Sequence, residues 1–172
     1  MNYAKFVAVV LLSLGVSMSA QASGYIGVDG TSLALDNQLD KDLNPRGIRL
    51  RLGMRLDDVF DAEFHLGGGS DRHTEAFDDF STSYMGGFLK AYLPIGQRSA
   101  LFGLAGVSGV EISQTINGNE FSDSRSGFSY GFGLETELSK RLDLSADYVR
   151  YVGDDGEFSD ISAFSFGVKW YF

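Results

Sequence analysis

Apolar and polar residues alternate one by one along several long segments of this chain. In segment 48–56, apolar side chains occupy every second position, and three arginines and a glycine stand between them. A helix would scatter those arginines around its circumference, whereas a strand places them all on one face. Segment 60–66 repeats the pattern with Asp61, Glu63 and His65 between its apolar residues. Both segments are therefore predicted to be two-faced β-strands.

The same rhythm recurs often enough to predict eight strands. The first segment is the weakest, because two glycines and an aspartate dilute its pattern. Another segment is rich in glycine and ambiguous in its facing, although Phe102 and Leu104 share one side. The predicted strands cover 25–35, 48–56, 60–66, 84–93, 100–112, 128–138, 142–148 and 164–172.

The connections between these segments alternate in length. Short turns are predicted at 57–58, 94–98 and 139–141, and long polar loops at 36–46, 68–80, 114–126 and 152–161. Outer-membrane barrels show this alternation, with short periplasmic turns and longer outer loops. The sequence therefore predicts an all-β fold, an eight-stranded antiparallel up-and-down transmembrane β-barrel with four longer outer loops.

The N-terminus has the features of a secretory signal peptide. An apolar run over 6–16 follows the single cation Lys5, and small residues lead up to Ala22. The run is too short for a membrane-spanning helix, which needs roughly 20 apolar residues. We expect cleavage after Ala22, which divides the chain into a signal peptide, 1–22, and one barrel domain, 23–172.

Composition narrows the possible classes of protein. The chain has no cysteine, so an exported fold must be held by hydrogen bonds and burial rather than by disulfides. Its formal net charge is −9, and no basic stripe offsets this acidity. An acidic chain of this kind is a poor binder of nucleic acid, and we expect no nucleic-acid partner.

Periodicity alone does not say which face of each strand points inward. A soluble lipocalin-like barrel would bury its apolar face and expose its charges. Export, strands of about ten residues and aromatic residues near strand ends favour a membrane barrel with the opposite arrangement. The aromatic residues expected in an interfacial girdle are Tyr148, Trp170, Tyr171 and Phe172.

A membrane barrel must then hold its charged residues inside. Eight strands enclose a space only wide enough for side chains or one small ligand, and buried charges are costly unless they are paired. The turn at 57–58 also places Arg51 and Arg55 opposite members of the Asp61, Glu63 and His65 set. We expect a charge-paired, plugged lumen; the alternative is a gated ion path. The predicted network comprises Arg49, Arg51, Arg55, Asp61, Glu63, His65, Glu135, Glu137, Asp143, Asp147 and Lys169.

The end of the chain resembles the closing strand of outer-membrane barrels, which finish on an aromatic residue. The apolar residues that carry this resemblance are Phe164, Phe166, Val168, Trp170 and Phe172. Segments 87–96 and 102–107 are similar to the middle hairpin of small porin-like barrels of the opacity, OmpX and OmpA-transmembrane type. The resemblance implies a location in the outer membrane of a Gram-negative bacterium, with the terminal strand read by the barrel-assembly machinery.

For function, these features favour a structural or surface-interaction barrel, which we expect to be a monomer among outer-membrane lipids and lipopolysaccharide. A narrow porin or transporter is the first alternative. A lipid-modifying enzyme is a weaker one, because only His65 and His73 could act as a base and neither stands in a His-x-Ser pattern. We expect no enzymatic activity, no cofactor and no metal.

The predicted outer loops are rich in carboxylates. Segment 154–157 (Asp-Asp-Gly-Glu) is the best local candidate for Ca²⁺ or Mg²⁺, although it lacks the spacing of an EF-hand. The simpler interpretation is that these acids solvate the loops and hold them away from anionic lipopolysaccharide.

Overall fold

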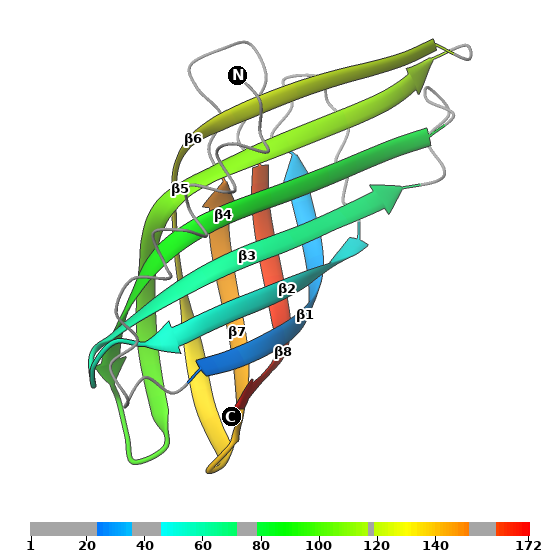
Figure 1. Cartoon of the computed structure of the whole chain (residues 1–172). Helices are drawn as coiled ribbons and strands as arrows, with labels where there is room; N and C mark the ends of the chain where they lie inside the picture. Colours follow the sequence, from blue (N-terminus) through cyan, green and yellow to red (C-terminus); the bar gives the residue numbers. More distant parts are fainter. Residues whose placement is uncertain (1–23, 36–45, 72–78, 117–118, 152–160) are drawn as a thin grey trace.

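The computed structural model describes residues 24–35, 46–71, 79–116, 119–151 and 161–172. Within these ranges eight strands follow one another as β1 to β8 and close into a barrel (Figure 1). The strands are β1 (Gly24–Leu35), β2 (Arg46–Arg55), β3 (Phe60–Asp71), β4 (Asp79–Pro94), β5 (Ser99–Ile116), β6 (Asn119–Ser139), β7 (Leu142–Tyr151) and β8 (Ile161–Tyr171). The eight-stranded antiparallel barrel predicted from the alternation is confirmed. None of the described residues forms a helix long and apolar enough to cross a membrane.

Closure depends on the pairing of the first strand with the last. β1 pairs with β8 in an antiparallel register from Tyr25 opposite Tyr171 to Leu35 opposite Ile161. Each of the strands β2 to β7 pairs with its two neighbours in sequence. The barrel therefore has no unpaired edge along its closed wall, which is the condition for a sheet to stand in hydrocarbon.

The two faces of each strand point in the directions expected for a membrane barrel, with the charged face toward the lumen and the apolar face outward. The aliphatic and aromatic set points outward, as shown by Ile48 at 64% exposure and Phe132 at 66%, whereas Arg49 and Arg51 have 0% exposure. The glycine-rich strand β5 keeps the two-residue alternation but differs in composition, because Leu101 is exposed whereas Phe102 and Leu104 point into the lumen and are buried. Most charged residues of the strands therefore lie inside the barrel, and apolar residues form most of its outer surface.

One predicted loop is wrong. Segment 114–126 was expected to be a long outer connection, but β5 continues to Ile116 and β6 begins at Asn119. These two residues are paired, which leaves only Asn117 and Gly118 between them. Asn-Gly between two extended segments is a strong signal for a two-residue hairpin, and it outweighs the polar composition on which the loop was predicted. Three of the four outer connections are long.

The barrel is consequently uneven in height. Strands β4, β5 and β6 have 16, 18 and 21 residues, whereas β2 and β7 have 10 each. At about 3.3 Å per residue, β6 is roughly 35 Å longer than β2 along its own direction. Figure 1 shows these three strands continuing past the others at the end opposite the short turns. We call this extension the protruding sheet.

Glycines on the inner face make room for large side chains. A Cβ on Gly67 of β3 would lie 2.7 Å from Cε2 of the ring of Tyr84, the residue paired with it on β4. We predict that Gly67→Val destabilises the barrel by about 1–3 kcal/mol, the usual cost of overpacking. Gly96, whose Cβ would meet nothing within 4 Å, offers the control Gly96→Ala, which should change stability very little. Urea unfolding in lipid vesicles measures both, and equal stability of the two variants would contradict the prediction.

Candidate functional site: the lumen

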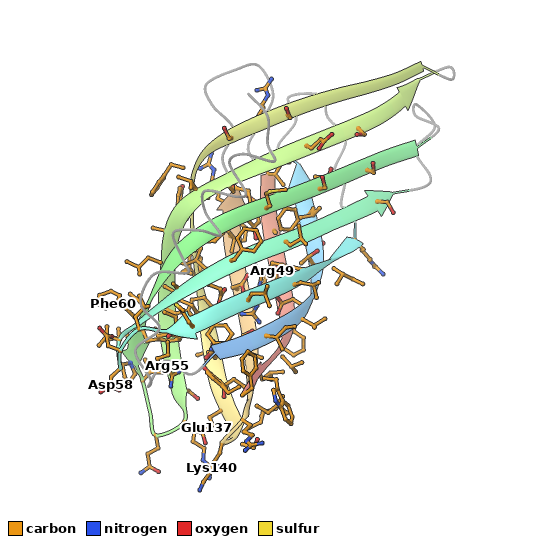
Figure 2. All side chains as sticks on the ribbon, in the orientation of Figure 1. Arg49, Arg55, Asp58, Phe60, Glu137 and Lys140 are labelled. Atoms are coloured by element: carbon orange, nitrogen blue, oxygen red, sulfur yellow. The ribbon has the colours of Figure 1, made fainter. Side chains whose placement is uncertain are left out.

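The interior of the barrel is a continuous layer of charged and aromatic side chains. Arg49 of β2 lies at its centre (Figure 2) and donates to Asp29 of β1 at 2.8 Å. It also donates to both carboxylate oxygens of Asp147 of β7, at 3.0 and 2.5 Å. All three side chains are almost completely buried. A single guanidinium thus links β2 to β7 across the seam where β1 and β8 close the barrel.

Arg51 makes a second connection across the same seam. Its Nη2 donates to Asp29 and to the Ser145 hydroxyl of β7, both at 2.6 Å. Its Nη1 lies 4.0 Å from Oε1 of Glu63. Asp29 therefore lies between two arginines of the neighbouring strand, and β1 and β2 are joined by their lumen side chains as well as by their backbones.

Nearer the short turns, two lysines replace the arginines. Lys90 of β4 donates to Glu135 of β6 at 3.0 Å and lies 3.5 Å from Glu63 of β3. Lys169 of β8 donates to Glu135 as well. Both lysines have 0% exposure, and Glu135 therefore joins β4 to β8.

Aromatic rings surround these two ammonium groups. Nζ of Lys169 lies 4.4 Å from the ring centroid of Tyr25 and 4.8 Å from that of Tyr171. Nζ of Lys90 lies 3.8 Å from the centroid of Phe102. Cation–π contacts of this kind strengthen when the cation is removed from water, so the rings compensate part of the cost of burying the lysines.

Two contacts join strands on opposite sides of the barrel. Lys169 of β8 donates to the hydroxyl of Tyr92 of β4 at 3.1 Å. Nδ1 of His65, on β3, lies 3.1 Å from the hydroxyl of Tyr151 on β7, and its Nε2 lies 2.6 Å from Glu63. In a ring of eight strands, β4 faces β8 and β3 faces β7. Side chains therefore cross the full width of the lumen at two levels.

The lumen is less polar toward the loop end. A buried cluster there joins Tyr84, Val149 and Tyr151 with the ends of β1 and β8 at Leu33 and Ile161. The rings of Tyr84 and Tyr151 lie 4.5 Å apart. The charged layer is thus followed by an apolar and aromatic layer on the side of the long connections.

The opposite end of the lumen opens into a cavity of about 550 Å³. Its lining includes Arg55, Tyr92, Glu135, Asp143 and Tyr171. Tyr92 and Glu135 both contact Lys169, so a contact that crosses the lumen lies at the inner end of this cavity.

The structure places most of the predicted lumen residues on the inner face, at differing depths. Arg55 lies opposite Asp61 and Arg51 opposite His65 in the strand register. Arg55 is 43% exposed at the mouth, where its Nε lies 3.6 Å from Asp61. Asp143 lies at the same end, 3.8 Å from Lys169.

Two predicted positions are wrong. Glu137 was expected in the buried network, but its side chain is exposed at the short-turn end (Figure 2). It is the last inward position of β6 before the register shifts between Glu137 and Ser139. Tyr171 was expected in the outer girdle, but it shares the inner face of β8 with Lys169, and its hydroxyl accepts from Arg55 at 3.1 Å.

Sequence reasoning missed several members of the network, namely Asp29, Lys90, Tyr25, Tyr92, Ser145 and Tyr151. The alternation could have found Asp29 and Lys90, because both occupy the polar phase of their strands. The tyrosines gave no such signal, since a tyrosine suits the lumen and the lipid interface equally well.

Some predicted features fall on residues that the structure does not describe. These are the signal peptide, His73 and the acidic segment 154–157. Within the described ranges, no group of three or more His, Cys, Asp or Glu side chains could hold a metal ion.

Comparison with known proteins gives the architecture a family. A model described as "Outer membrane protein beta-barrel domain" matches residues 6–172. Neisserial surface protein A superposes with a TM-score of 0.75 at 18% identity, covering 88% of this chain and 99% of that one. Ail, the attachment invasion locus protein of Yersinia pestis, gives a TM-score of 0.64 at 20% identity, covering 88% and 97%.

The N-terminal barrel of Pseudomonas aeruginosa OprF gives a TM-score of 0.64 at 12% identity and covers 88% of this chain and 100% of that one. No curated protein shows a significant match. At these identities the solved structures share the fold, while the family model spans nearly the whole sequence. The protein is therefore located in the outer membrane, and its chain belongs to the outer membrane protein β-barrel domain family.

Proposed function

We propose that this protein is a non-conducting outer-membrane barrel whose role is structural and lies at the cell surface. The observation that carries the proposal is the pair of contacts across the lumen, Lys169 with Tyr92 and His65 with Tyr151. An ion path would have to pass both levels. Lys169 donates a charge-assisted hydrogen bond at the first level, and at the second level the carboxylate of Glu63 holds His65; such bonds are stronger than neutral ones.

A narrow porin or transporter is the second candidate, and the cavity of about 550 Å³ at the short-turn end favours it. The cavity opens at one end of the barrel, and contacts across the lumen lie beyond it. The apolar layer around Tyr84 and Tyr151 adds a further barrier for ions, because hydrated charge is costly to move past apolar groups.

A lipid-modifying activity has less support. His65 is completely buried, with its two ring nitrogens beside Glu63 and Tyr151. A base in that position has no access to a lipid on the outer surface. We therefore propose a non-enzymatic role without a cofactor, for a monomer in contact with outer-membrane lipids and lipopolysaccharide and inserted by the barrel-assembly machinery.

The protruding sheet is the element that we propose for surface interactions. It rises beyond the strands that close the barrel and carries polar residues on its outer face, among them Ser81, Ser83, Glu111 and Ser126. A lipid-facing sheet would carry apolar residues at these positions, as the lower parts of the same strands do with Leu89. This change of polarity supports a sheet that stands clear of the membrane.

Planar-bilayer recording tests the closed lumen. We expect wild-type protein to give no large, steady conductance, whereas Tyr92→Ala combined with Tyr151→Ala, which removes one partner from each lumen-crossing contact, should give frequent openings. The fold of each sample is checked by its heat-dependent migration in gels, and its insertion by recovery from the vesicles. A steady wild-type conductance that tracks the amount of inserted protein would overturn the plugged interior and favour the narrow porin.

The charge network makes a prediction about stability. Asp147→Asn removes the carboxylate that accepts two hydrogen bonds from Arg49. Removing one partner of a buried ion pair costs about 3–5 kcal/mol, so urea unfolding in vesicles, followed by the single tryptophan Trp170, should begin at clearly lower urea. The control Asp58→Asn alters an exposed turn residue and should stay within about 0.5 kcal/mol of wild type. Matching stabilities of the two variants would refute a stabilising role for the Arg49 pair.

The surface role requires one orientation, and the absence of cysteine makes it easy to test. We expect Ser126→Cys, in the protruding sheet, to react with a membrane-impermeant maleimide on intact cells. Lys140→Cys, in the short turn between β6 and β7, should react only after the outer membrane has been permeabilised. Labelling of Lys140→Cys on intact cells would reverse the orientation and refute the surface role.

A further inference from the structure

The cavity at the short-turn end of the lumen has the size of a small-molecule site. Its volume of about 550 Å³ falls within the range of ligand pockets, about 300–1,000 Å³. The contact from Lys169 to the Tyr92 hydroxyl lies at its inner end. Figure 2 shows three lining residues, Arg55, Glu137 and Lys140, together at this end of the barrel. The cavity therefore suits a small solute that binds from the short-turn side.

Charged side chains of both signs line this cavity. The cations are Arg55, Arg98 and Lys140, and the carboxylates are those of Asp58, Glu135, Glu137 and Asp143. Glu135 is already matched, because Lys90 and Lys169 both donate to it. Without Glu135 the lining carries three cations and three carboxylates. This balance suits a ligand that has charges of both signs and no net charge.

Two of the carboxylates stand side by side on one wall. Glu137 of β6 is directly opposite Asp143 of β7 in the register. The backbone N–H of Glu137 donates to Arg98 on the other side of β6, so this is a non-hydrogen-bonded pair, in which side chains are closest. Lys169 lies 3.8 Å from Asp143 but is shared with Glu135. Like charges directly opposite each other destabilise a sheet, so an ammonium group between them would be stabilising.

A guanidinium stands on the facing wall. In a ring of eight strands β2 faces β6, so Arg55 lies across the mouth from Glu137. The Arg55 side chain is 43% exposed, with its Nη2 donating to the Tyr171 hydroxyl and its Nε 3.6 Å from Asp61. A guanidinium has five N–H donors, so these two contacts leave others for a ligand. Arginine binds carboxylates with two parallel hydrogen bonds, and this wall therefore suits a carboxylate.

The width of the barrel indicates how far apart the two charges of a ligand should be. Eight strands about 4.8 Å apart and tilted by about 40° form a wall roughly 16 Å across. Side chains that reach inward from Arg55 and Glu137 leave several ångströms between their charged ends. In a free amino acid both charges are attached to one carbon. In a peptide of two or three residues they are about 4–8 Å apart, since successive Cα atoms are separated by about 3.8 Å.

We propose that this cavity binds a short zwitterionic peptide of two or three residues. Its ammonium group would lie between Glu137 and Asp143, and its carboxylate on Arg55. Pro94 and Ala100, which also line the cavity, provide an apolar surface for small side chains. The source of the peptide rests on the proposed function, whose orientation places this end of the barrel in the periplasm. Binding itself depends neither on that orientation nor on whether the lumen conducts.

The test titrates the isotope-labelled barrel in lipid nanodiscs with trialanine and follows the backbone amide chemical shifts. Shifts are expected at Arg55 and Glu137 and not at Ser126 in the protruding sheet. Arg55→Gln and Glu137→Gln alter exposed side chains, and each should weaken trialanine binding about fivefold, as expected for loss of one partly exposed ion pair. Arg141→Gln and Glu111→Gln, at exposed positions outside the cavity lining, are the matched controls and should bind as wild type does.

Peptide derivatives assign each end of the ligand. N-acetylated trialanine should bind wild type more weakly than trialanine does and be insensitive to Glu137→Gln. Trialanine amide should likewise bind more weakly and be insensitive to Arg55→Gln. Free alanine and the diamine putrescine, which lack the two separated charges of opposite sign, should both bind more weakly than trialanine.

The outcomes separate this site from the closed lumen. Equal trialanine binding by wild type and both folded variants, or no shift at the cavity with millimolar trialanine, would overturn the site. Binding of alanine or putrescine as strong as that of trialanine would overturn the assignment to a peptide. A steady conductance in planar bilayers would refute the closed lumen and leave peptide binding standing, whereas loss of the peptide site would leave the conductance result unchanged.

Discussion

The whole structure depends on how a narrow barrel accommodates charge. A strand that crosses hydrocarbon must point its polar residues inward, and eight strands leave little room for them. Each buried ion costs several kcal/mol unless a counter-ion compensates it. Arg49, Asp29 and Asp147 show the solution, since one guanidinium is matched by two carboxylates from different strands. The same alternation therefore determines both the fold and the lumen, because it places apolar residues on the lipid-facing wall and charged residues together inside the barrel.

The partners in this network come from strands far apart in sequence. Arg49 and Asp147 are separated by 98 positions and meet only when β1 and β8 have paired. Lys169 likewise joins β8 to Glu135 on β6 and Tyr92 on β4. In an incomplete barrel these charges would lack their counter-ions, so barrel closure and charge pairing stabilise each other. The contacts across the seam favour the closed barrel over any open sheet.

The sequence predicted the structure well wherever a two-residue period was clear. It predicted less well where a turn signal or a local register shift determined the structure. It predicted the eight strands and the side on which Arg49, Asp61 and Lys169 lie. It failed at 114–126, where serines and acids suggested a loop although Asn117-Gly118 indicated a hairpin. The polar composition of that segment correctly indicated exposure to water, because the protruding sheet is polar. It could not distinguish a loop from a water-exposed strand. The position of Glu137 depended on a local register shift that no periodicity encodes.

The remaining question is why the barrel is uneven. A protein needed only to fill the membrane could end all its strands at the interface, as β2 and β7 do with 10 residues each. Three strands instead continue outward and exchange apolar outer residues such as Leu89 for serines such as Ser83. An extended sheet in water lacks the lipid that supports the barrel wall, so its order must come from its own hydrogen bonds and from its attachment to a rigid base. The charge-filled lumen supplies that base. In the function that we propose, the closed interior and the protruding sheet are complementary, since a plugged barrel gives up conduction and gains the rigidity with which to hold a sheet outside the cell.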